Sequence, residues 1–501
     1  MVCGGAGRVR ATPERGHTGT EPTTVAVYRR MNGRRQCTYL VVTQQLPKSP
    51  TMQSPSARFP RVLARRTVLW EPSLLHITRT LLDCGELRRP SRRWLPLLTI
   101  LVAGMPLCFA IPYRLKVLPI AVLFAASIAL VLADRRRRAS YIRAWLVLLA
   151  CVAVVLFSVV NVAATGGGWR SLDLPAQNII FLGIAGAFVL PLRWRRVWLL
   201  FSLTTCGLGA INVVQHYWYG VVRPYGPNNG DWGAVEYAMI LVVMSLLALV
   251  QLLRTGALGW ERGIHALACF LGLFGALLSQ SRGPLLAFAL VFLGVLALHV
   301  VRTKHWCSSL LALIAVMGCL VVTTTYVQPE IGQRLLQVHT EVDSYRPVSD
   351  ARGAIRERLE LWRAAWGAFR THPWNGVGIG RFGDYVKERV AQGRSNPVIA
   401  QYEHAHNEYM EAAATGGLPG LLVLLGVFLV PLGYFFRRCR DPDETMSVIA
   451  TMGLVVVGVY MSCALTDNVF YRAMPHSLYY FLVTGLAVLS SRVPAPTPKL
   501  I

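Results

Sequence analysis

The sequence is poor in charged residues, and it is poorest in acidic ones. Only 15% of its 501 residues are charged while 54% are hydrophobic, and 25 Asp and Glu stand against 51 Lys and Arg. A soluble protein of this length carries more charge and fewer apolar residues. The composition therefore excludes an ordinary soluble enzyme and predicts an integral membrane protein.

No signal peptide, cysteine framework or nucleic-acid motif is expected from the sequence. No apolar core follows a charged start near the first residue. The 11 cysteines include no C-x-x-C pair, so neither a zinc ribbon nor a set of disulfides is indicated. The net charge of +26 is spread over short clusters between apolar runs, which argues against DNA or RNA as a partner.

Residues 1–93 differ in composition from the rest of the chain. They hold 17 Lys and Arg against 5 Asp and Glu and are rich in Pro, Ser, Thr and Gly. Such a segment buries too little apolar surface to fold, so we predict a disordered basic cytoplasmic tail. A second hypothesis, which the composition fits equally well, is that translation begins at Met31 or Met52.

From Trp94 onward, apolar runs of about 18 to 23 residues recur, each long enough as a helix to cross a membrane. The predicted fold is all-α, a polytopic integral membrane protein with about twelve transmembrane helices over residues 94–490 and a short cytoplasmic C-terminal tail over 491–501. The expected spans are 94–111, 115–133, 144–164, 174–192, 197–216, 234–253, 263–280, 284–301, 306–327, 412–436, 446–466 and 474–490.

Arginine and lysine are distributed unequally between the two sides that these spans define. Clusters on one side hold 19 of them, whereas the short loops of the other side hold 6. The positive-inside rule makes the richer side cytoplasmic, so both termini are expected in the cytoplasm.

One long connection, residues 328–405 between the ninth and tenth spans, falls on the outer side, which is the periplasm in a Gram-negative cell. Over residues 328–404 it has 11 Lys and Arg and 9 Asp and Glu, a balance typical of a small folded and partly helical element. A helix lying at the membrane surface is predicted there by apolar residues at helical spacing, namely Ile355, Leu359, Trp362, Trp366 and Phe369.

The outer side carries the candidate chemistry, beginning with the tight turn 279–284. Arg282 is the only charge in this turn, in a place that the positive-inside bias disfavours. A contact with lipid headgroups is one explanation. The other is that its guanidinium grips a phosphate or pyrophosphate, which it does bidentately and without a metal.

His404 and His406 lie where the long loop re-enters the membrane. Three interpretations fit them: histidines bonded to backbone or water, metal ligands together with the nearby Glu403, Glu408 and Glu411, or a catalytic base. On a helix the two rings point about 200° apart and cannot share an ion, so no metal is expected. A histidine beside arginines stays neutral and can take a proton from a hydroxyl.

The glycines of residues 376–380 suggest a nucleotide-binding loop, but no βαβ unit surrounds them, and we interpret the segment as flexible chain. Together with other positions they resemble the O-antigen ligase and polymerase superfamily, whose pattern H-[NSQ]-x9-G-x-x-[GTY] is met at every fixed position. The residues that carry the resemblance are Ser281, Arg282, Gly283, Arg358, Leu359, Trp362, Pro373, Asn375, Gly376, Gly378, Gly380, His406, Asn407, Gly417 and Gly420, and more weakly 226–229 and 466–468.

The resemblance implies a bacterial inner-membrane enzyme that moves a glycan from undecaprenyl pyrophosphate to an acceptor hydroxyl, with inversion and without a metal or another cofactor. Arg282 would hold the pyrophosphate, helped by Arg358 or Arg334, and His406 would activate or orient the acceptor. Asn407 and Asp467 are the remaining expected substrate-binding residues.

Within the superfamily, the layout of twelve spans with one long loop is most similar to the ligases. These transfer O-antigen to lipid A-core in lipopolysaccharide biosynthesis, so the expected partners are the lipid-linked glycan donor, the lipid A-core acceptor and membrane lipids, with no nucleic acid. An O-antigen polymerase and an O-linked protein oligosaccharyltransferase are the alternatives. A transporter would show two similar halves, and a non-catalytic scaffold would tolerate replacement of Arg282 and His406.

Overall fold

A computed structural model describes residues 24–32, 35–43, 94–110, 113–227, 233–322, 325 and 342–492. The chain divides into two units, Met1–Glu71 and Pro72–Ile501. In the first unit, β1 (Thr24–Asn32) pairs with β2 (Arg35–Thr43) as an antiparallel hairpin. This hairpin was not predicted from the sequence and lies within the expected tail; the rest of that tail lies outside the described residues.

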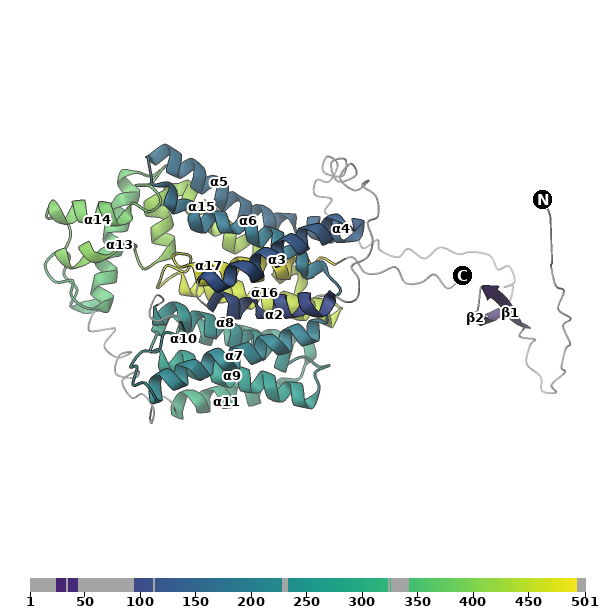
Figure 1. The fold of residues 1–501 in the computed structure, drawn as a ribbon. Helices are drawn as coiled ribbons and strands as arrows, with labels where there is room; N and C mark the ends of the chain where they lie inside the picture. Colours follow the sequence, from purple (N-terminus) through teal and green to yellow (C-terminus); the bar gives the residue numbers. More distant parts are fainter. Residues whose placement is uncertain are drawn as a thin grey trace, which may run out of the picture. The chain divides into compact units, whose positions relative to one another are not determined.

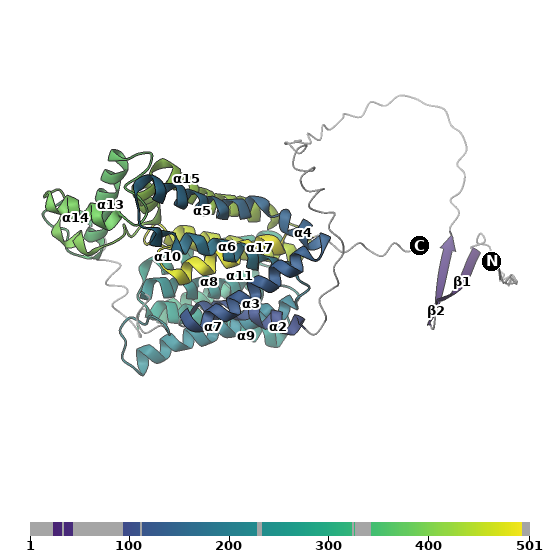
Figure 2. The ribbon, with the colours of Figure 1, turned by 45° about the horizontal axis from the view of Figure 1, so that its top comes forward.

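The second unit is a bundle of helices with a small helical cap at one end (Figures 1 and 2). Its α-helices are α2 (Leu95–Ala110), α3 (Tyr113–Leu132), α4 (Arg135–Ile142), α5 (Trp145–Thr165), α6 (Asp173–Ala185), α7 (Trp194–Tyr217), α8 (Ala234–Leu252), α9 (Gly259–Leu278), α10 (Arg282–Thr303), α11 (Trp306–Val322), α13 (Ala354–Thr371), α14 (Phe382–Ala391), α15 (Glu408–Arg438), α16 (Glu444–Cys463) and α17 (Ala473–Leu489). Short 3-10 helices are η1 (Trp169–Leu172), η2 (Gly186–Val189) and η4 (Pro397–Gln401).

Among the described residues, eight helical segments are long and apolar enough to cross a membrane. Helices α3 and α4 form a pair bent by 109° that adds a ninth, and α2, α11 and α17 are shorter apolar helices. Each predicted span overlaps one of these elements. The all-helical, multi-pass character of this part of the chain is therefore confirmed, while the count of twelve spans stays a prediction.

Helices α8 and α16 lie at the centre of the bundle. In their apolar windows 83% and 72% of the residues are buried, against 33% for α5 and α15. A helix that is apolar all round has no water-facing side, and inside a bundle every face of it can pack. The outer helices leave large apolar side chains exposed, as expected for surfaces that meet lipid.

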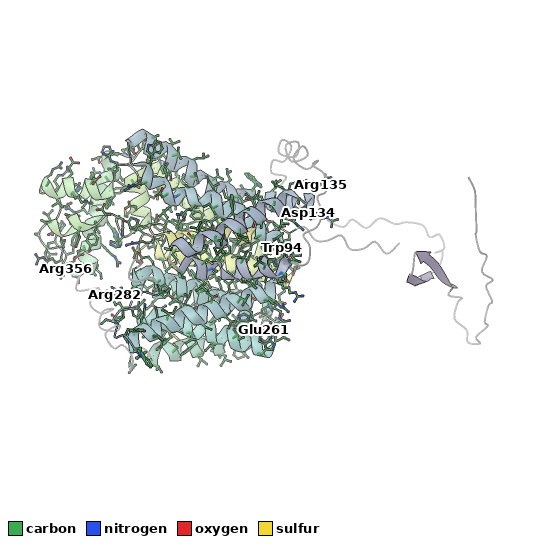
Figure 3. All side chains as sticks on the ribbon, in the orientation of Figure 1. Trp94, Asp134, Arg135, Glu261, Arg282 and Arg356 are labelled. Carbon is green, nitrogen blue, oxygen red and sulfur yellow. The ribbon has the colours of Figure 1, made fainter. Side chains whose placement is uncertain are left out.

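The residues that charge counting assigned to different sides lie at opposite ends of the bundle. Figure 3 shows Asp134, Arg135 and Glu261 at one end, and Arg282 at the other end beside the cap formed by α13 and α14. The two sides inferred from the sequence are therefore physically separate. Which of them faces the cytoplasm stays a prediction.

The predicted surface helix is present as α13, but a different face of it packs against the protein. Leu361, Ala364, Ala365 and Ala368 are almost fully buried, whereas Trp366 is 51% exposed. Small alanines allow the backbones of α13 and its neighbours to come close, so they form the contact. The larger apolar stripe noted in the sequence is left partly exposed.

Helix α15 is broken at Gly417, whose φ of 63° and ψ of −157° are not helical. The break exposes backbone groups to which the 373–380 segment binds: Val377 N–H donates to Ala414 O at 2.9 Å, and Gly378 N–H donates to Thr415 O at 3.0 Å. A Cβ on Gly376 would lie 2.2 Å from the Thr415 carbonyl carbon. The interpretation of this glycine segment as flexible chain was wrong, because its backbone is tied to α15.

Candidate active site

A cavity of about 860 Å³ lies between the end of the bundle and α13. Five segments far apart in the sequence contribute to its lining: the α7–α8 loop with the start of α8, the turn before α10, the first turns of α13, the loop before α15, and the loop between α16 and α17. This volume is in the range of pockets that bind organic ligands. The expected site residues that line it are Arg282, Arg358, His406 and Asp467.

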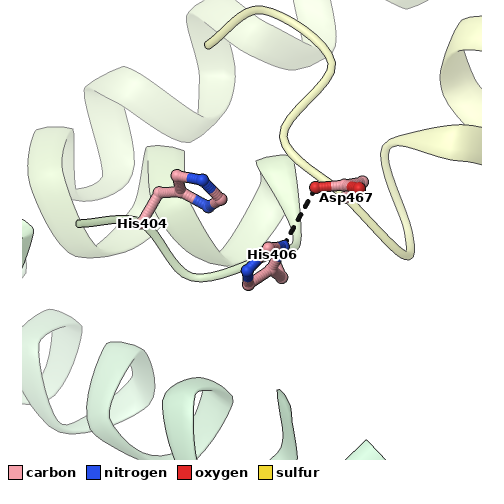
Figure 4. A group of neighbouring side chains, drawn as sticks. All are labelled: His404, His406 and Asp467. Atoms are coloured by element: carbon pink, nitrogen blue, oxygen red, sulfur yellow. Dashed lines mark hydrogen bonds and ion pairs between the residues drawn. The ribbon is translucent and has the colours of Figure 1, made fainter. Parts of the chain in front are cut away.

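His406 and Asp467 form a hydrogen-bonded pair in this cavity (Figure 4). The distance from His406 Nδ1 to Asp467 Oδ1 is 3.1 Å, and the side chains are 23% and 13% exposed. When Nδ1–H donates to the carboxylate, Nε2 is the nitrogen that can accept a proton. The contact can fix the orientation of the imidazole, while the substrate binding expected of Asp467 stays a prediction.

The acidity of Asp467 follows from this pairing. Burial alone would raise its pKa, but the hydrogen bond from His406 and the positive charge of Arg358 outweigh that effect and lower the pKa. Asp467 is therefore a carboxylate at neutral pH. A fixed anion beside an imidazole stabilises the imidazolium that forms when the ring takes up a proton.

Arg282 is the first residue of α10 and follows a strained turn in which Gln280 has a φ of 54°. A Cβ on Gly283 would lie 2.3 Å from Thr466 Oγ1, so glycine lets this turn approach the loop that carries Asp467. The N-terminus of a helix carries a partial positive charge and attracts anions. The guanidinium group and the helix end therefore favour an anion in the same part of the cavity.

The part of the chain that contains Arg282, Arg358 and His406 matches a family model. Residues 267–425 match the family model described as O-antigen ligase, and this range includes Arg282, Arg358 and His406. This part of the chain is therefore similar to the O-antigen ligase superfamily. It is also 20% identical to an uncharacterized protein of Haemophilus influenzae over 323 residues, which are 63% of this chain and 78% of that protein. The family supports a membrane glycosyltransferase of the O-antigen ligase or polymerase type.

Asn407, the second residue of the superfamily pattern, does not line the cavity but joins two of the segments that do. Its Oδ1 accepts from the N–H groups of Tyr409 and Met410, at 3.0 and 3.1 Å, and so caps α15. Its Nδ2 donates to Leu465 O at 3.0 Å. Asn, Ser and Gln can all accept such bonds, so this position of the ligase pattern has a structural reason.

Two carboxylates of α15 hold the loops that carry the histidine and the aspartate. Glu411 Oε2 accepts from Ala405 N–H at 2.8 Å, directly before His406. Glu408 Oε2 accepts from Phe470 N–H at 3.2 Å, shortly after Asp467. The sequence suggested only metal binding for these acidic residues. Their contacts with backbone N–H groups of other segments have no signal in the sequence.

His404 and His406 are neighbours, with ring centroids 4.3 Å apart, because residues 402–407 are not helical. The argument that a helix would separate them was therefore wrong. Ligand atoms of His404, His406 and Asp467 lie within 4.8 Å of one another, a spacing that could hold a metal ion. Against a cation stand the cavity's arginines, and the expected absence of a metal stays a prediction.

Two more arginines, Arg223 and Arg472, line the cavity and were not predicted as site residues. Arg223 Nε donates to Ser279 O at 3.1 Å, and Arg472 Nε lies 3.6 Å from Glu236 Oε1. Both are among the few basic residues of the outer side. The same rarity singles out Arg282 in the sequence, so it could have pointed to Arg223 and Arg472 as well. Arg334 lies outside the described residues, as do Asn228 and Asn229.

Proposed function

We propose that this protein is a metal-independent inverting glycan transferase that moves O-antigen from undecaprenyl pyrophosphate to a hydroxyl of lipid A-core, at the periplasmic face of the inner membrane. The observation that carries the proposal is the placement of Arg282, Arg358 and the His406–Asp467 pair around one cavity. An anion-binding group and a proton acceptor in one chamber are what this transfer requires.

The arginines act on the leaving group. When the anomeric carbon separates from the lipid pyrophosphate, negative charge develops on the phosphate oxygens. Arg282 and Arg358 stabilise this charge by bidentate hydrogen bonds, and the N-terminus of α10 adds to their field. Loss of one such group lowers the rate about 10²- to 10³-fold.

The His406–Asp467 pair acts on the acceptor. Nε2 of His406 takes the proton of the acceptor hydroxyl while its oxygen bonds to the anomeric carbon, and the bond from that carbon to the pyrophosphate oxygen breaks. Attack from the face opposite the leaving group inverts the anomeric configuration. Asp467 keeps the imidazole in the tautomer that this step needs.

The family alone leaves a ligase and a polymerase as the two main reactions. Ligation is favoured by the layout of spans with a single long outer loop, which is most similar to the ligases. A polymerase, or transfer to protein, would use the same arginines and histidine with another acceptor. The acceptor therefore decides between these functions.

The decisive experiment is transfer in vitro by the purified full chain, with an undecaprenyl-pyrophosphate-linked O-chain, lipid A-core and a chelator. We expect transfer by the wild type, and a loss of about 10²-fold or more in His406→Ala and Arg282→Ala. Arg356→Ala is the matched control, because Arg356 lies on α13 beside Arg358 but pairs with Asp350 at 2.7 Å outside the cavity.

Three other outcomes of this experiment would contradict parts of the proposal. Lengthening of the lipid-linked chain without use of lipid A-core identifies a polymerase. A requirement for added metal contradicts metal independence, and full activity of both cavity variants contradicts the assignment of the site.

A further inference from the structure

A second cavity, of about 440 Å³, lies on the other side of the histidine loop. It is formed by α5, α6, α15 and α17 together with residues 379–380 and 468–471. Glu403 and Tyr471 line this cavity, whereas His404 and His406 line the first one. The two chambers are therefore separated by the same short segments that carry the proposed catalytic pair.

The lining of the second cavity changes in character along α15. Near the start of the helix it is acidic, with Glu408 and Glu411, and farther on it is aliphatic, with Val423, Leu424 and Val427. Phe157 and Phe470 add aromatic surface. A ligand that fits such a gradient has a hydroxyl-rich head and an apolar chain.

The acidic part is suited to hydroxyl groups. Glu408 and Glu411 each use one carboxylate oxygen for a backbone N–H group. Ionised or protonated, each carboxyl group keeps an oxygen for a sugar hydroxyl, as an acceptor in the first case and as a donor or acceptor in the second. Glu403, at the same end, is paired with Lys387 at 3.1 Å and keeps its other oxygen for such a contact.

An unpartnered polar atom lies in the same cavity. His476 is only 3% exposed, and its Nδ1 has no hydrogen-bond partner among the described residues. A buried polar atom left unpaired costs free energy, which a ligand hydroxyl or carbonyl group would recover. This is an observation separate from the shape and charge of the lining.

The distance between the chambers is short. The ring of Tyr471, in the second cavity, lies 4.3 Å from the ring of His404, which lies 4.3 Å from that of His406. A saccharide held at Glu403 needs to pass only this pair of rings to bring a hydroxyl to His406.

We propose that the second cavity is the acceptor site and takes a glycolipid, with its apolar chain between α5 and α15 and its saccharide at Glu403, Glu408 and Glu411. This proposal rests on the proposed function, because only a transferase has an acceptor. The binding of a hydroxyl-headed amphiphile to the cavity is tested independently of transfer.

The test is photo-crosslinking of the full chain in phospholipid nanodiscs, with an alkyl glycoside that carries a diazirine in its alkyl chain. In the wild type we expect labelling of the peptide that contains Val423 to Val427. Val423→Trp fills the cavity and should lower the labelling about tenfold. Leu422→Trp is the control, because Leu422 is 58% exposed on the same helix and should leave the labelling unchanged.

A milder variant, Ala412→Leu, narrows the same cavity and covers the case in which Val423→Trp fails to fold. Equal labelling by a phospholipid probe with the same chain, or no loss of labelling in either cavity variant, overturns the proposal. With transfer active, we expect the cavity variants to raise KM for the acceptor and leave KM for the donor unchanged. Glycoside binding without any transfer would retain the cavity assignment and refute the proposed function instead.

Discussion

The two cavities on either side of residues 403–407 differ in the charge of their linings. The first is lined by four arginines, Arg223, Arg282, Arg358 and Arg472, and three acidic residues, Glu236, Glu357 and Asp467. The second is lined by three acidic residues, Glu403, Glu408 and Glu411, and one arginine, Arg170. Arginines attract a pyrophosphate, whereas carboxyl groups form hydrogen bonds with hydroxyls. In the two proposals above, one loop therefore separates a chamber for an anionic leaving group from a chamber for a neutral saccharide.

The largest expected effect is on the chemistry assigned to the first cavity. Asp467→Asn keeps the shape of the side chain but lets its amide donate to His406 Nδ1, which places the imidazole proton on the wrong nitrogen. We expect the turnover number to fall about 10²-fold or more, with little change in glycoside labelling of the second cavity. Comparable losses in turnover and labelling would show that the two chambers are not functionally distinct.

His404 lies between the two chambers, and its burial predicts that the stability of the protein depends on pH. Burial, and then the charge of His406, lowers the pKa of His404 to about 4, against an ordinary value of 6.5. Between these values the unfolded chain binds more protons than the folded one, so stability falls as the pH drops from 6.5 toward 4. The contribution is about 3 kcal/mol at most. Thermal unfolding in nanodiscs should show a weaker pH dependence for His404→Phe; an unchanged dependence would contradict this assignment.

The break in α15, the helix that lines the second chamber, predicts a loss of stability on substitution. Gly417→Ala places a Cβ 2.6 Å from Pro373 O at a φ of 63°. We expect a loss of about 1–3 kcal/mol, measured by thermal unfolding of the full chain. Gly426→Ala is the control, because that glycine is helical with open space around it and the change should be neutral or slightly stabilising. Equal effects of the two substitutions would argue against strain at Gly417.

A smaller effect is expected for Glu411, which lines the second cavity and holds the loop that carries His406. Glu411→Ala leaves Ala405 N–H without its acceptor and frees the loop before His406, so transfer should fall about tenfold. Glu411→Gln keeps an acceptor oxygen and should restore most of the activity. The informative readout is the turnover number at saturating donor and acceptor. Equal loss in both variants would mean that the negative charge of Glu411 matters, rather than its hydrogen bond.

Much of the site could be predicted because its residues carry unusual signals along the chain. Arg282 breaks the positive-inside bias, and His406 begins a spaced pattern. The closeness of the His404 and His406 rings was not predicted, because the argument assumed a helix and residues 402–407 are not helical. The roles of Asn407 and Glu411 depend on contacts with residues 405 and 465–468, whose proximity has no local signature.

Hydropathy, charge bias and motif spacing are properties of the chain alone, so the sequence could predict the membrane class and the positions of the apolar helices, and it could single out Arg282 and His406 as candidates. The contact of Asp467 with His406, the binding of residues 376–380 to the break in α15, and the wall between the two chambers appear only in the folded chain. The first joins residues 61 apart and the second joins segments 37 residues apart, so each contact follows from packing rather than from any local pattern.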